Sequence, residues 1–237
     1  MNNTSYRRIL LKLSGEVLAG EKGYGIDPQM TNYLASQVKI IHDTGIETGI
    51  VIGAGNIFRG ASVENDGIDR VSGDYLGMTA TIMNSVALQS ALEKINCDTR
   101  VMSALTITQL AEPYIRRRAT RHLEKKRIVI FAGGTGNPYF TTDTAAALRA
   151  VEINAEVIIK GTNVDGVYDS DPETNPTAKQ FDFLTYKQVI EKELRVMDLT
   201  AVTLCKENKL PIVVLNILKK NNLLKLIHGK QIGTQVS

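Results

Sequence analysis

Residues 127–151 read RIVIFAGGTGNPYFTTDTAAALRAV, and this stretch decides the fold. A short run of β-branched and aromatic residues, 127–131, precedes a loop with three glycines and a proline, 133–143. An alanine-rich run typical of a helix, residues 144–151, follows the loop. The order of strand, shaped loop and helix predicts one unit of an open α/β sheet. Such sheets bind ligands at the carboxyl ends of their strands, where this loop would lie.

The loop has the chemistry of an anion site. Thr141, Thr142 and Asp143 stand where the following helix should begin. At such a position, backbone N–H groups and hydroxyls point toward a negatively charged group. A turn followed by a helix cap would use the same residue types, so the functional interpretation depends on what the rest of the chain supplies.

The same alternation of short apolar strands and longer helical patterns continues along the whole chain. Strands are expected at residues 8–13, 48–52, 100–102, 128–131, 157–159 and 212–215, and helices at residues 30–44, 75–95, 118–126, 187–192, 199–208 and 223–228. Residues 161–183 are expected to form a hairpin or loop excursion. Continuous apolar strands between helices predict an α/β fold, a three-layer αβα sandwich around a mostly parallel twisted sheet. With no linker or repeat, residues 1–237 are expected to form a single domain.

Composition narrows the class of protein. The chain is 43% hydrophobic and 22% charged with a formal net charge of +3, which is too mild to indicate a nucleic-acid partner. Cys97 and Cys205 stand far apart without a zinc or disulfide pattern, and free thiols fit a reducing cytosol. The polar start has no signal-peptide pattern, and no apolar run is long enough for a membrane span. A cytoplasmic protein is expected.

Two further glycine turns follow strands. Lys12 stands at a strand end beside Ser14 and Gly15, where an ammonium group and backbone donors can meet a phosphate. In the turn 53–60, glycines allow close approach to the backbone, and Arg59 could fork onto phosphate oxygens. A surface lysine and a structural turn remain the alternatives when each segment is taken alone.

Asp74 and the segment 160–172 complete the set of candidate features. Asp74 opens a helical pattern and is most simply an acid at the start of a helix. In the later segment Asp165-Gly166 is a turn signal, and Tyr168 among hydroxyl, amide and carboxylate groups could hold a base and ribose. A plain β-hairpin would carry the same residues.

Several well-known sites are excluded. The chain has no G-x-x-x-x-G-K-[ST] phosphate loop, no H-E-x-x-H zinc motif and no G-x-S-x-G nucleophile elbow. Phe58 and Tyr139 stand where a dinucleotide fingerprint would need its last glycine. His42, His122 and His228 are isolated and are expected to be surface or capping residues.

Taken in chain order, these segments resemble one family. The matching segments are residues 12–16, 53–60, Asp74 with 77–84, 133–143, 165–168 with 171–172, and 196–201. Each motif is weak alone, but their shared order is specific, and the chain resembles the bacterial uridylate (UMP) kinases of the amino-acid kinase superfamily from end to end. The resemblance implies the amino-acid kinase fold and Mg²⁺-dependent transfer of the ATP γ-phosphoryl group to UMP, giving UDP and ADP. It also implies a homohexamer in the cytoplasm that serves pyrimidine nucleotide (CTP/UTP) biosynthesis.

The resemblance assigns contacts to both substrates and assigns no residue as a metal ligand. ATP contacts are expected from Lys12, Leu13, Ser14, Gly15, Gly55, Arg59, Thr162, Tyr168 and Asp171. UMP contacts are expected from Ala54, Asp74, Thr135, Gly136, Asn137, Pro138, Tyr139, Phe140, Thr141 and Thr142. Asp74 would bind the ribose hydroxyls, and residues 135–142 would hold the uracil and the acceptor phosphate.

Three residues are expected to act on the reacting groups. Lys12 and Arg59 would offset the charge that develops on the transferred phosphoryl oxygens. Asp143 would orient Lys12 or a Mg²⁺-bound water, and Asp198 could play a similar part. The alternative for Asp143 is an acid at a helix N-terminus, and both roles can hold together.

The chain departs from the family pattern in three places. Ala54 stands where many members have a glycine, and its backbone contact survives only if φ is negative. Tyr168 can be phenylalanine in relatives, so its hydroxyl is not essential. Some members are activated by GTP through basic residues, and the corresponding neighbourhood here holds Gln89, Glu93 and Arg100, which argues against such activation.

Two other classes of function fit the same fold. A sibling kinase acting on a carboxylate or carbamate would not need Asp74 or the long pocket formed by residues 135–142. A non-catalytic nucleotide-binding regulator would be expected to lack the phosphate-binding lysine, and Lys12 is present.

Overall fold

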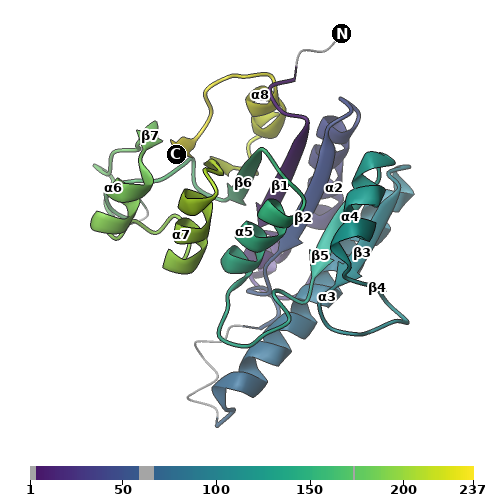
Figure 1. The fold of residues 1–237 in the computed structure, drawn as a ribbon. Coiled ribbons are helices and arrows are strands. Elements are labelled where there is room, and N and C mark those ends of the chain that lie inside the picture. Colours follow the sequence, from purple (N-terminus) through teal and green to yellow (C-terminus); the bar gives the residue numbers. More distant parts are fainter. Residues whose placement is uncertain (1–3, 59–66, 173) are drawn as a thin grey trace.

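The computed structural model describes residues 4–58, 67–172 and 174–237 and contains one central sheet (Figure 1). Within these ranges the sheet has nine strands in the order β4-β3-β5-β2-β1-β6-β8-β9-β7. The strands are β1 (Arg8–Leu13), β2 (Glu47–Ile52), β3 (Thr99–Ser103), β4 (Glu112–Pro113), β5 (Ile128–Ala132), β6 (Val157–Thr162), β7 (Phe183–Leu184), β8 (Ile212–Asn216) and β9 (Thr234–Val236). Neighbouring strands pair in parallel, except that β8 and β9 are antiparallel.

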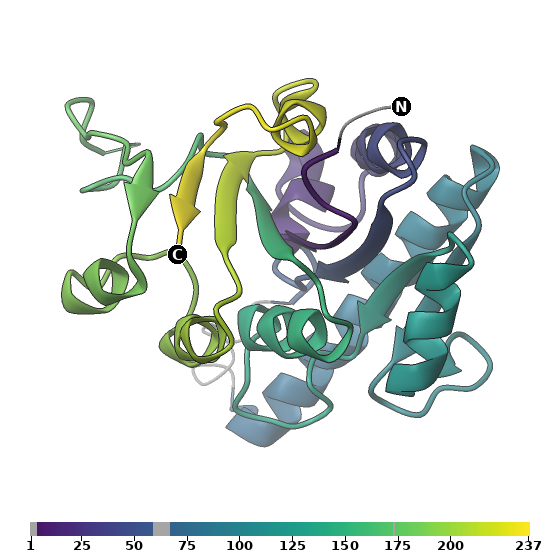
Figure 2. The same cartoon turned by 45° about the horizontal axis from the view of Figure 1, so that its top comes forward.

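Helices cover both faces of the sheet. They are α1 (Gly15–Leu18), the 3₁₀ helix η1 (Gly20–Lys22), α2 (Pro28–His42), α3 (Arg70–Lys94), α4 (Arg116–Glu124), α5 (Thr142–Glu152), α6 (Tyr186–Glu191), α7 (Leu199–Glu207) and α8 (Asn222–Ile227). Figure 2 shows α5 and α7 on one side of the strands and α2 and α8 on the other.

The strand side chains alternate between two hydrophobic cores, as the pleat of a strand requires. In β1, Ile9 and Leu11 pack in the core beneath α2, α3 and α8, whereas Leu10 packs in the core beneath α4, α5, α6 and α7. Every residue of β1, β2 and β5 is buried, and most of these residues are apolar, as expected for strands covered on both faces. The predicted α/β fold, with its mostly parallel sheet between two helical layers, is therefore confirmed.

The structure differs from the sequence-based expectation at the start of the long helix. Asp69 caps α3 by accepting a hydrogen bond from the Ser72 backbone N–H at 3.1 Å, and the helix begins at Arg70. Asp74 therefore lies in the second turn, and the interpretation of Asp74 as an acid at the helix start is wrong. Ser72 and Gly73 are weak helix formers, so local propensity hides the first turn.

The shortest helices and strands could not be predicted from hydrophobic periodicity. The two-residue and three-residue strands β4, β7 and β9 and the short α1 and η1 contain too few residues to display a repeat. The excursion expected at residues 161–183 is confirmed as a hairpin-like turn closed by an antiparallel bridge between Tyr168 and Gln180.

Cys97 and Cys205 are buried free thiols. In the described ranges, no helix combines the length and apolarity needed to cross a membrane.

Candidate active site

Predicted site residues meet at the carboxyl edge of the sheet. β1, β2, β5 and β6 run parallel and close together in the sheet order, so the turns that follow them open at the same edge. These turns contain Ser14-Gly15, Gly53-Ala54-Gly55, residues 133–141 and residues 163–168.

Two lysines converge on one carboxylate at this edge. Lys12 of β1 and Lys160 of β6 are direct register partners on neighbouring parallel strands. The Lys12 Nζ lies 2.5 Å from Asp143 Oδ1, and the Lys160 Nζ lies 3.1 Å from Asp143 Oδ2. The Lys160 Nζ also donates to the Val196 carbonyl oxygen at 2.5 Å. Among the described residues, Oδ1 of Asp143 has no hydrogen-bond partner within the usual geometry, so its contact with Lys12 is an ion pair.

Burial and charge oppose each other in this cluster. Burial alone would raise the pKa of Asp143, but Lys12 and Lys160 outweigh it, so the pKa lies below its ordinary value. Burial lowers the pKa of Lys160, against the opposing effect of Asp143. The cluster therefore places two lysine side chains around one carboxylate beside the glycine turns. Such a cluster favours an anionic ligand.

Asp198 joins the beginnings of two helices. It caps α7 by accepting a hydrogen bond from the Ala201 N–H at 2.8 Å, and it accepts from the Thr144 hydroxyl at 3.0 Å. It also accepts a hydrogen bond from the hydroxyl of Thr141, the residue that caps α5. These contacts fix the first turn of α5, in which Asp143 lies.

The loop between β5 and α5 contains four residues in the left-handed region. Gly133, Gly134, Gly136 and Tyr139 all have positive φ. The Tyr139 N–H donates to Asp74 Oδ2 at 2.7 Å, so the structure brings Asp74 to this loop. Tyr139 is 67% exposed and is free of the hydrophobic cores, as a ligand-contacting aromatic would be.

Asp74 is itself held in place. Arg70, one turn earlier on α3, lies 3.0 Å from its Oδ2 oxygen, and the Arg70 guanidinium stacks over the Tyr139 ring at 5.8 Å. The remaining predicted acceptor residues, Thr135, Gly136, Asn137, Pro138, Phe140, Thr141 and Thr142, follow one another around the same loop into α5. The Thr135 hydroxyl donates to the Asn137 carbonyl oxygen at 3.1 Å, a local hydrogen bond within this loop.

The turns after β1 and β2 touch each other. A Cβ atom on Gly15 would lie 2.5 Å from the Gly53 carbonyl oxygen, so only glycine fits there. The Gly53 N–H donates to the Leu13 carbonyl oxygen at 2.9 Å. Ala54 is not among the described residues with positive φ, so its methyl group is accommodated without backbone strain. Arg59, predicted to be catalytic, lies outside the described residues.

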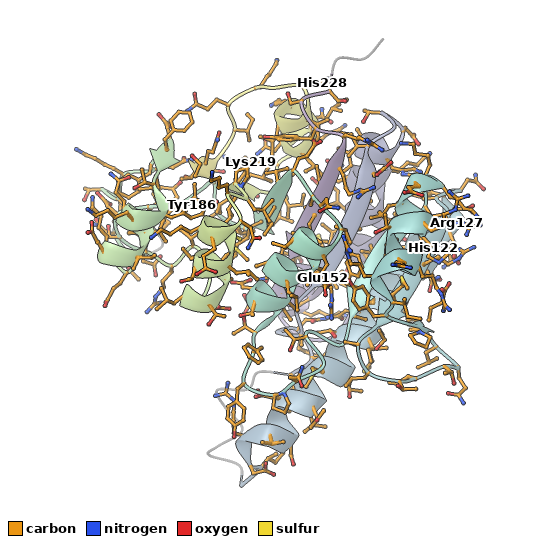
Figure 3. All side chains as sticks on the ribbon, in the orientation of Figure 1. His122, Arg127, Glu152, Tyr186, Lys219 and His228 are labelled. Atoms are coloured by element: carbon orange, nitrogen blue, oxygen red, sulfur yellow. The ribbon has the colours of Figure 1, made fainter. Side chains whose placement is uncertain are left out.

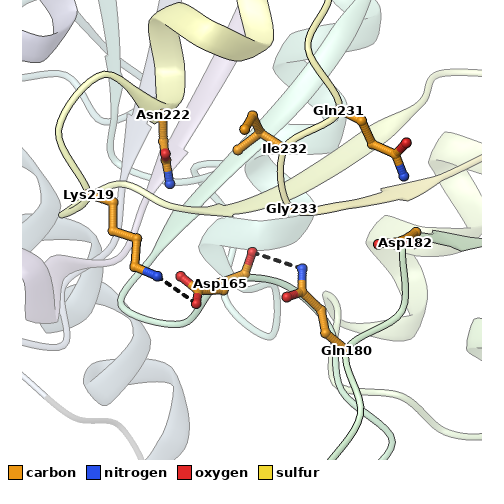
Figure 4. Close-up of a pocket in the computed structure, with 8 residues that line it drawn as sticks. All are labelled: Asp165, Gln180, Asp182, Lys219, Asn222, Gln231, Ile232 and Gly233. Carbon is orange, nitrogen blue, oxygen red and sulfur yellow. Dashed lines mark hydrogen bonds and ion pairs between the residues drawn. The ribbon is translucent and has the colours of Figure 1, made fainter.

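A hollow of about 450 Å³ opens beside the turn after β6 (Figure 4). It is lined by Asp165, Gln180, Asp182, Lys219, Asn222, Gln231, Ile232 and Gly233. Lys219 Nζ lies 2.7 Å from Asp165 Oδ2, as Figure 4 shows. Thr162 ends β6 next to this turn and accepts a hydrogen bond from the Val164 N–H at 2.9 Å. Tyr168 bridges to Gln180 on its rim, and Asp171 follows in the same excursion.

Two histidines, His122 on α4 and His228 at the end of α8, are labelled in Figure 3. His122 lies 3.2 Å from a Glu112 carboxylate oxygen and links α4 to β4. His228 ends α8, beside the chain that leads into β1, because the Ser5 N–H bonds to the Ile227 carbonyl oxygen. Neither histidine contacts Lys12, Asp143 or Lys160.

Sequence reasoning missed Lys160. Its signal was nevertheless present, since the strands Leu10-Leu11-Lys12 and Ile158-Ile159-Lys160 each place a lysine after two apolar residues and before a glycine turn. Only the pairing of β1 with β6 makes the two lysines neighbours.

Comparison with known proteins places the chain in one protein family. Residues 7–216 match the family model of the amino acid kinase family. The structure is similar to that of a UMP kinase from Bacillus anthracis, with 40% identity, a TM-score of 0.95 and coverage of 98% of this chain and 96% of that one. A UMP kinase from Ureaplasma parvum matches with 39% identity, a TM-score of 0.91 and coverage of 98% of both chains. A uridylate kinase from Archaeoglobus fulgidus matches with 28% identity, a TM-score of 0.74 and coverage of 97% of this chain and 99% of that one.

Proposed function

The chain belongs to the amino acid kinase family, and on that premise we propose that it is a UMP kinase that transfers the γ-phosphoryl group of ATP to UMP, giving UDP and ADP. The observation that carries the proposal is the meeting of two sites at one sheet edge. The Lys12–Asp143–Lys160 cluster would supply positive charge, and the loop that Asp74 contacts at Tyr139 leads into α5, whose first turn contains Asp143.

In the proposed arrangement the two substrates approach from different sides. The turns that contain Gly15 and Gly55 bind the ATP phosphates through backbone N–H groups, and the hollow beside Asp165 takes the adenosine end. Asp74 and residues 135–142 bind UMP, so that its phosphate reaches the start of α5. The contact between Gly53 and Gly15 supports a meeting point between donor and acceptor.

Phosphoryl transfer between two phosphates needs positioning and charge neutralisation more than acid–base chemistry. The UMP phosphate is already an anionic nucleophile at neutral pH. Lys12 would offset charge on the transferred group, with Arg59 assisting, and Asp143 would fix the position of the Lys12 ammonium. Lys160 pairs with Oδ2 of Asp143, and Lys12 pairs with Oδ1.

Mg²⁺ belongs to the proposal as a partner of the ATP phosphates. Both carboxylate oxygens of Asp143 face lysine ammonium groups. In the part of the chain that the structure describes, no group of three or more His, Cys, Asp or Glu side chains is placed to hold a metal ion. In this arrangement the two oxygens of Asp143 are engaged by lysines rather than open to a metal ion. Mg²⁺ commonly keeps several waters and binds substrate phosphates, so it would arrive with the nucleotide.

The proposal extends to a cytoplasmic homohexamer in pyrimidine nucleotide synthesis. Self-association is supported by exposed apolar side chains on α3, whose first turns project from the body in Figure 1. Tyr75, Leu76 and Met83 are 43%, 44% and 52% exposed. Sedimentation equilibrium is expected to give six times the chain mass. A monomer at micromolar concentration would contradict the proposed assembly.

An acceptor panel tests the proposed reaction. ADP release is followed with ATP and Mg²⁺ in the presence of UMP, CMP, acetylglutamate or carbamate. We expect rapid turnover with UMP and little with the others. Turnover with an acyl acceptor alone would indicate the sibling kinase activity, and no turnover with any acceptor would indicate a non-catalytic nucleotide-binding protein.

Asp74→Ala is expected to weaken UMP binding. The substitution removes the acceptor for the Tyr139 N–H and the ion-pair partner of Arg70, and it removes the proposed ribose contact. Hydrogen bonds to charged groups contribute about 1.5–3 kcal/mol, so the KM for UMP should rise at least about tenfold, with a smaller change in kcat. Initial-rate kinetics measure both constants.

Glu93→Ala, near the other end of α3, is the matched control for Asp74→Ala. Glu93 is exposed and contacts Arg100 at 3.9 Å, away from the acceptor loop, so its removal should leave the KM for UMP unchanged. An equal rise in the KM for ATP and for UMP in Asp74→Ala would contradict the assignment of Asp74 to the acceptor.

A further inference from the structure

We propose that Asn84 is a positioning residue for phosphoryl transfer, which holds the turn Gly53–Asn56 in place through a paired amide contact with Asn56. The inference rests on the proposed function, because it assigns this turn to the meeting point of donor and acceptor. Asn84 lies in the middle of α3 and has no exposed surface.

The two amide side chains satisfy each other. Asn84 Nδ2 donates to Asn56 Oδ1 at 2.7 Å, and Asn56 Nδ2 donates to Asn84 Oδ1 at 2.9 Å. The second donor of each group bonds to backbone, from Asn84 to the Gly53 carbonyl oxygen at 2.8 Å and from Asn56 to the Gly25 carbonyl oxygen at 2.7 Å. All four amide hydrogens are therefore used. A buried polar network that is fully satisfied fixes one arrangement, because any other leaves a buried group unpaired.

The turn that Asn84 holds lies between the two proposed substrate sites. The Gly53 carbonyl oxygen and Asn56 Oδ1 lie 2.5 Å and 2.7 Å from where a Cβ atom on Gly15 would be, so both pack directly on the ATP-binding turn. A Cβ atom on Gly53 would lie 3.1 Å from the Gly15 backbone nitrogen and 3.5 Å from the hydroxyl oxygen of Thr142, so Gly53 lies close to both proposed sites. A small shift of Gly53 would therefore move the donor and acceptor contacts together.

The helix that carries Asn84 also holds the acceptor loop. The Thr81 hydroxyl oxygen accepts a hydrogen bond from the Gly133 N–H at 2.9 Å, and Asp74 accepts one from the Tyr139 N–H. Spacings of seven and three residues place Asp74, Thr81 and Asn84 on one face of α3. The helix α3 thus contacts both the acceptor loop and the turn Gly53–Asn56. Asn84 is the residue of α3 that holds the turn.

Alanine variants of the pair test this role. Asn84→Ala, Asn56→Ala and the double variant are compared with Ser85→Ala. Ser85 is the next residue on α3 and is equally buried, but among the described residues its hydroxyl bonds within the helix, to the Thr81 carbonyl oxygen at 2.7 Å. Misplacement of a reacting group by about 1 Å can lower the rate about 10²-fold, so kcat/KM is expected to fall about tenfold to 10²-fold in Asn84→Ala. Ser85→Ala should match the wild type.

Two readouts separate positioning from a general loss of structure. The kcat/KM of the double variant should be no lower than that of the less active single variant, because the two amides act as one unit. Hydrogen–deuterium exchange of the Ile57 and Phe58 amides, which bond to the Ala54 carbonyl oxygen, should accelerate in Asn84→Ala and not in Ser85→Ala. Should Asn84→Ala fail to fold, Asn56→Ala breaks the same contact from the side of the turn.

The exchange measurement does not need catalytic activity. A wild-type chain that is inactive on UMP would refute the proposed function, whereas the exchange data would still decide whether Asn84 orders the turn. Exchange and kinetics of Asn84→Ala and Asn56→Ala that both equal those of Ser85→Ala would overturn the inference.

Discussion

Replacing Lys12 by alanine is expected to lower kcat about 10²-fold to 10³-fold, the range found when one donor to a developing negative charge is removed. The Lys12 ammonium lies 2.5 Å from Asp143 Oδ1 at the end of a buried strand, where it is desolvated and held in place. A preorganised charge of this kind acts mainly in the transition state. The KM for UMP should therefore change far less than kcat.

Steady-state kinetics with both substrates measure this effect. Lys39→Ala is the matched control, since Lys39 carries the same charge but pairs with Asp43 within the exposed surface of α2. Thermal unfolding should show that Lys12→Ala remains folded, because Lys160 still compensates Asp143. A Lys12→Ala enzyme with near-normal turnover would remove Lys12 from the proposed mechanism.

Asp143→Asn is expected to have the second largest effect, on both stability and rate. The change keeps the volume of the side chain but leaves the ammonium groups of Lys12 and Lys160 without their shared counter-charge. Breaking a buried ion pair from one side destabilises proteins by about 3–5 kcal/mol. We expect the lower end of this range, because the three side chains are 9%, 15% and 19% exposed. The kcat value should fall as strongly as in Lys12→Ala, because Lys12 loses its anchor.

The effect of Asp143→Asn on stability should depend on pH. The pKa of Asp143 is lowered in the folded protein, so its contribution to stability is present above the pKa of the unfolded chain. That contribution is lost as the pH falls through the folded pKa. Urea unfolding at pH 7 and at pH values below about 4 should therefore show the difference between wild type and Asp143→Asn shrinking with acid. A difference that stays constant over this range would show that Asp143 is not stabilised as a carboxylate.

Most of the fold can be predicted from the sequence, because the buried strands and the long helices have clear hydrophobic patterns. The βα unit at residues 127–151 was predicted with its loop at the correct sheet edge, and β5 and α5 confirm it. The approach of Asp74 to the loop at Tyr139 agrees with the grouping of these residues into one acceptor site.

The remaining features depend on pairing between distant parts of the chain. Lys160 meets Lys12 only through the register of β6 against β1, which local sequence does not specify. The pairing of Asn84 with Asn56 likewise needs α3 to pack on the turn after β2. The sequence alone allows Asp143 to act on a metal-bound water, on a lysine or on the helix end. Its contacts with two ammonium groups favour the lysines.

Direct tracing of the phosphoryl group tests the central claim most directly. The enzyme is incubated with UMP, Mg²⁺ and ATP labelled at its γ-phosphorus, and the products are separated by chromatography. The proposed reaction predicts that the label appears in UDP at its β-phosphoryl group, in amounts equal to the ADP formed, and that Lys12→Ala slows this transfer. Label recovered only in inorganic phosphate, or no loss of label from ATP, would contradict the assignment of this chain as a UMP kinase.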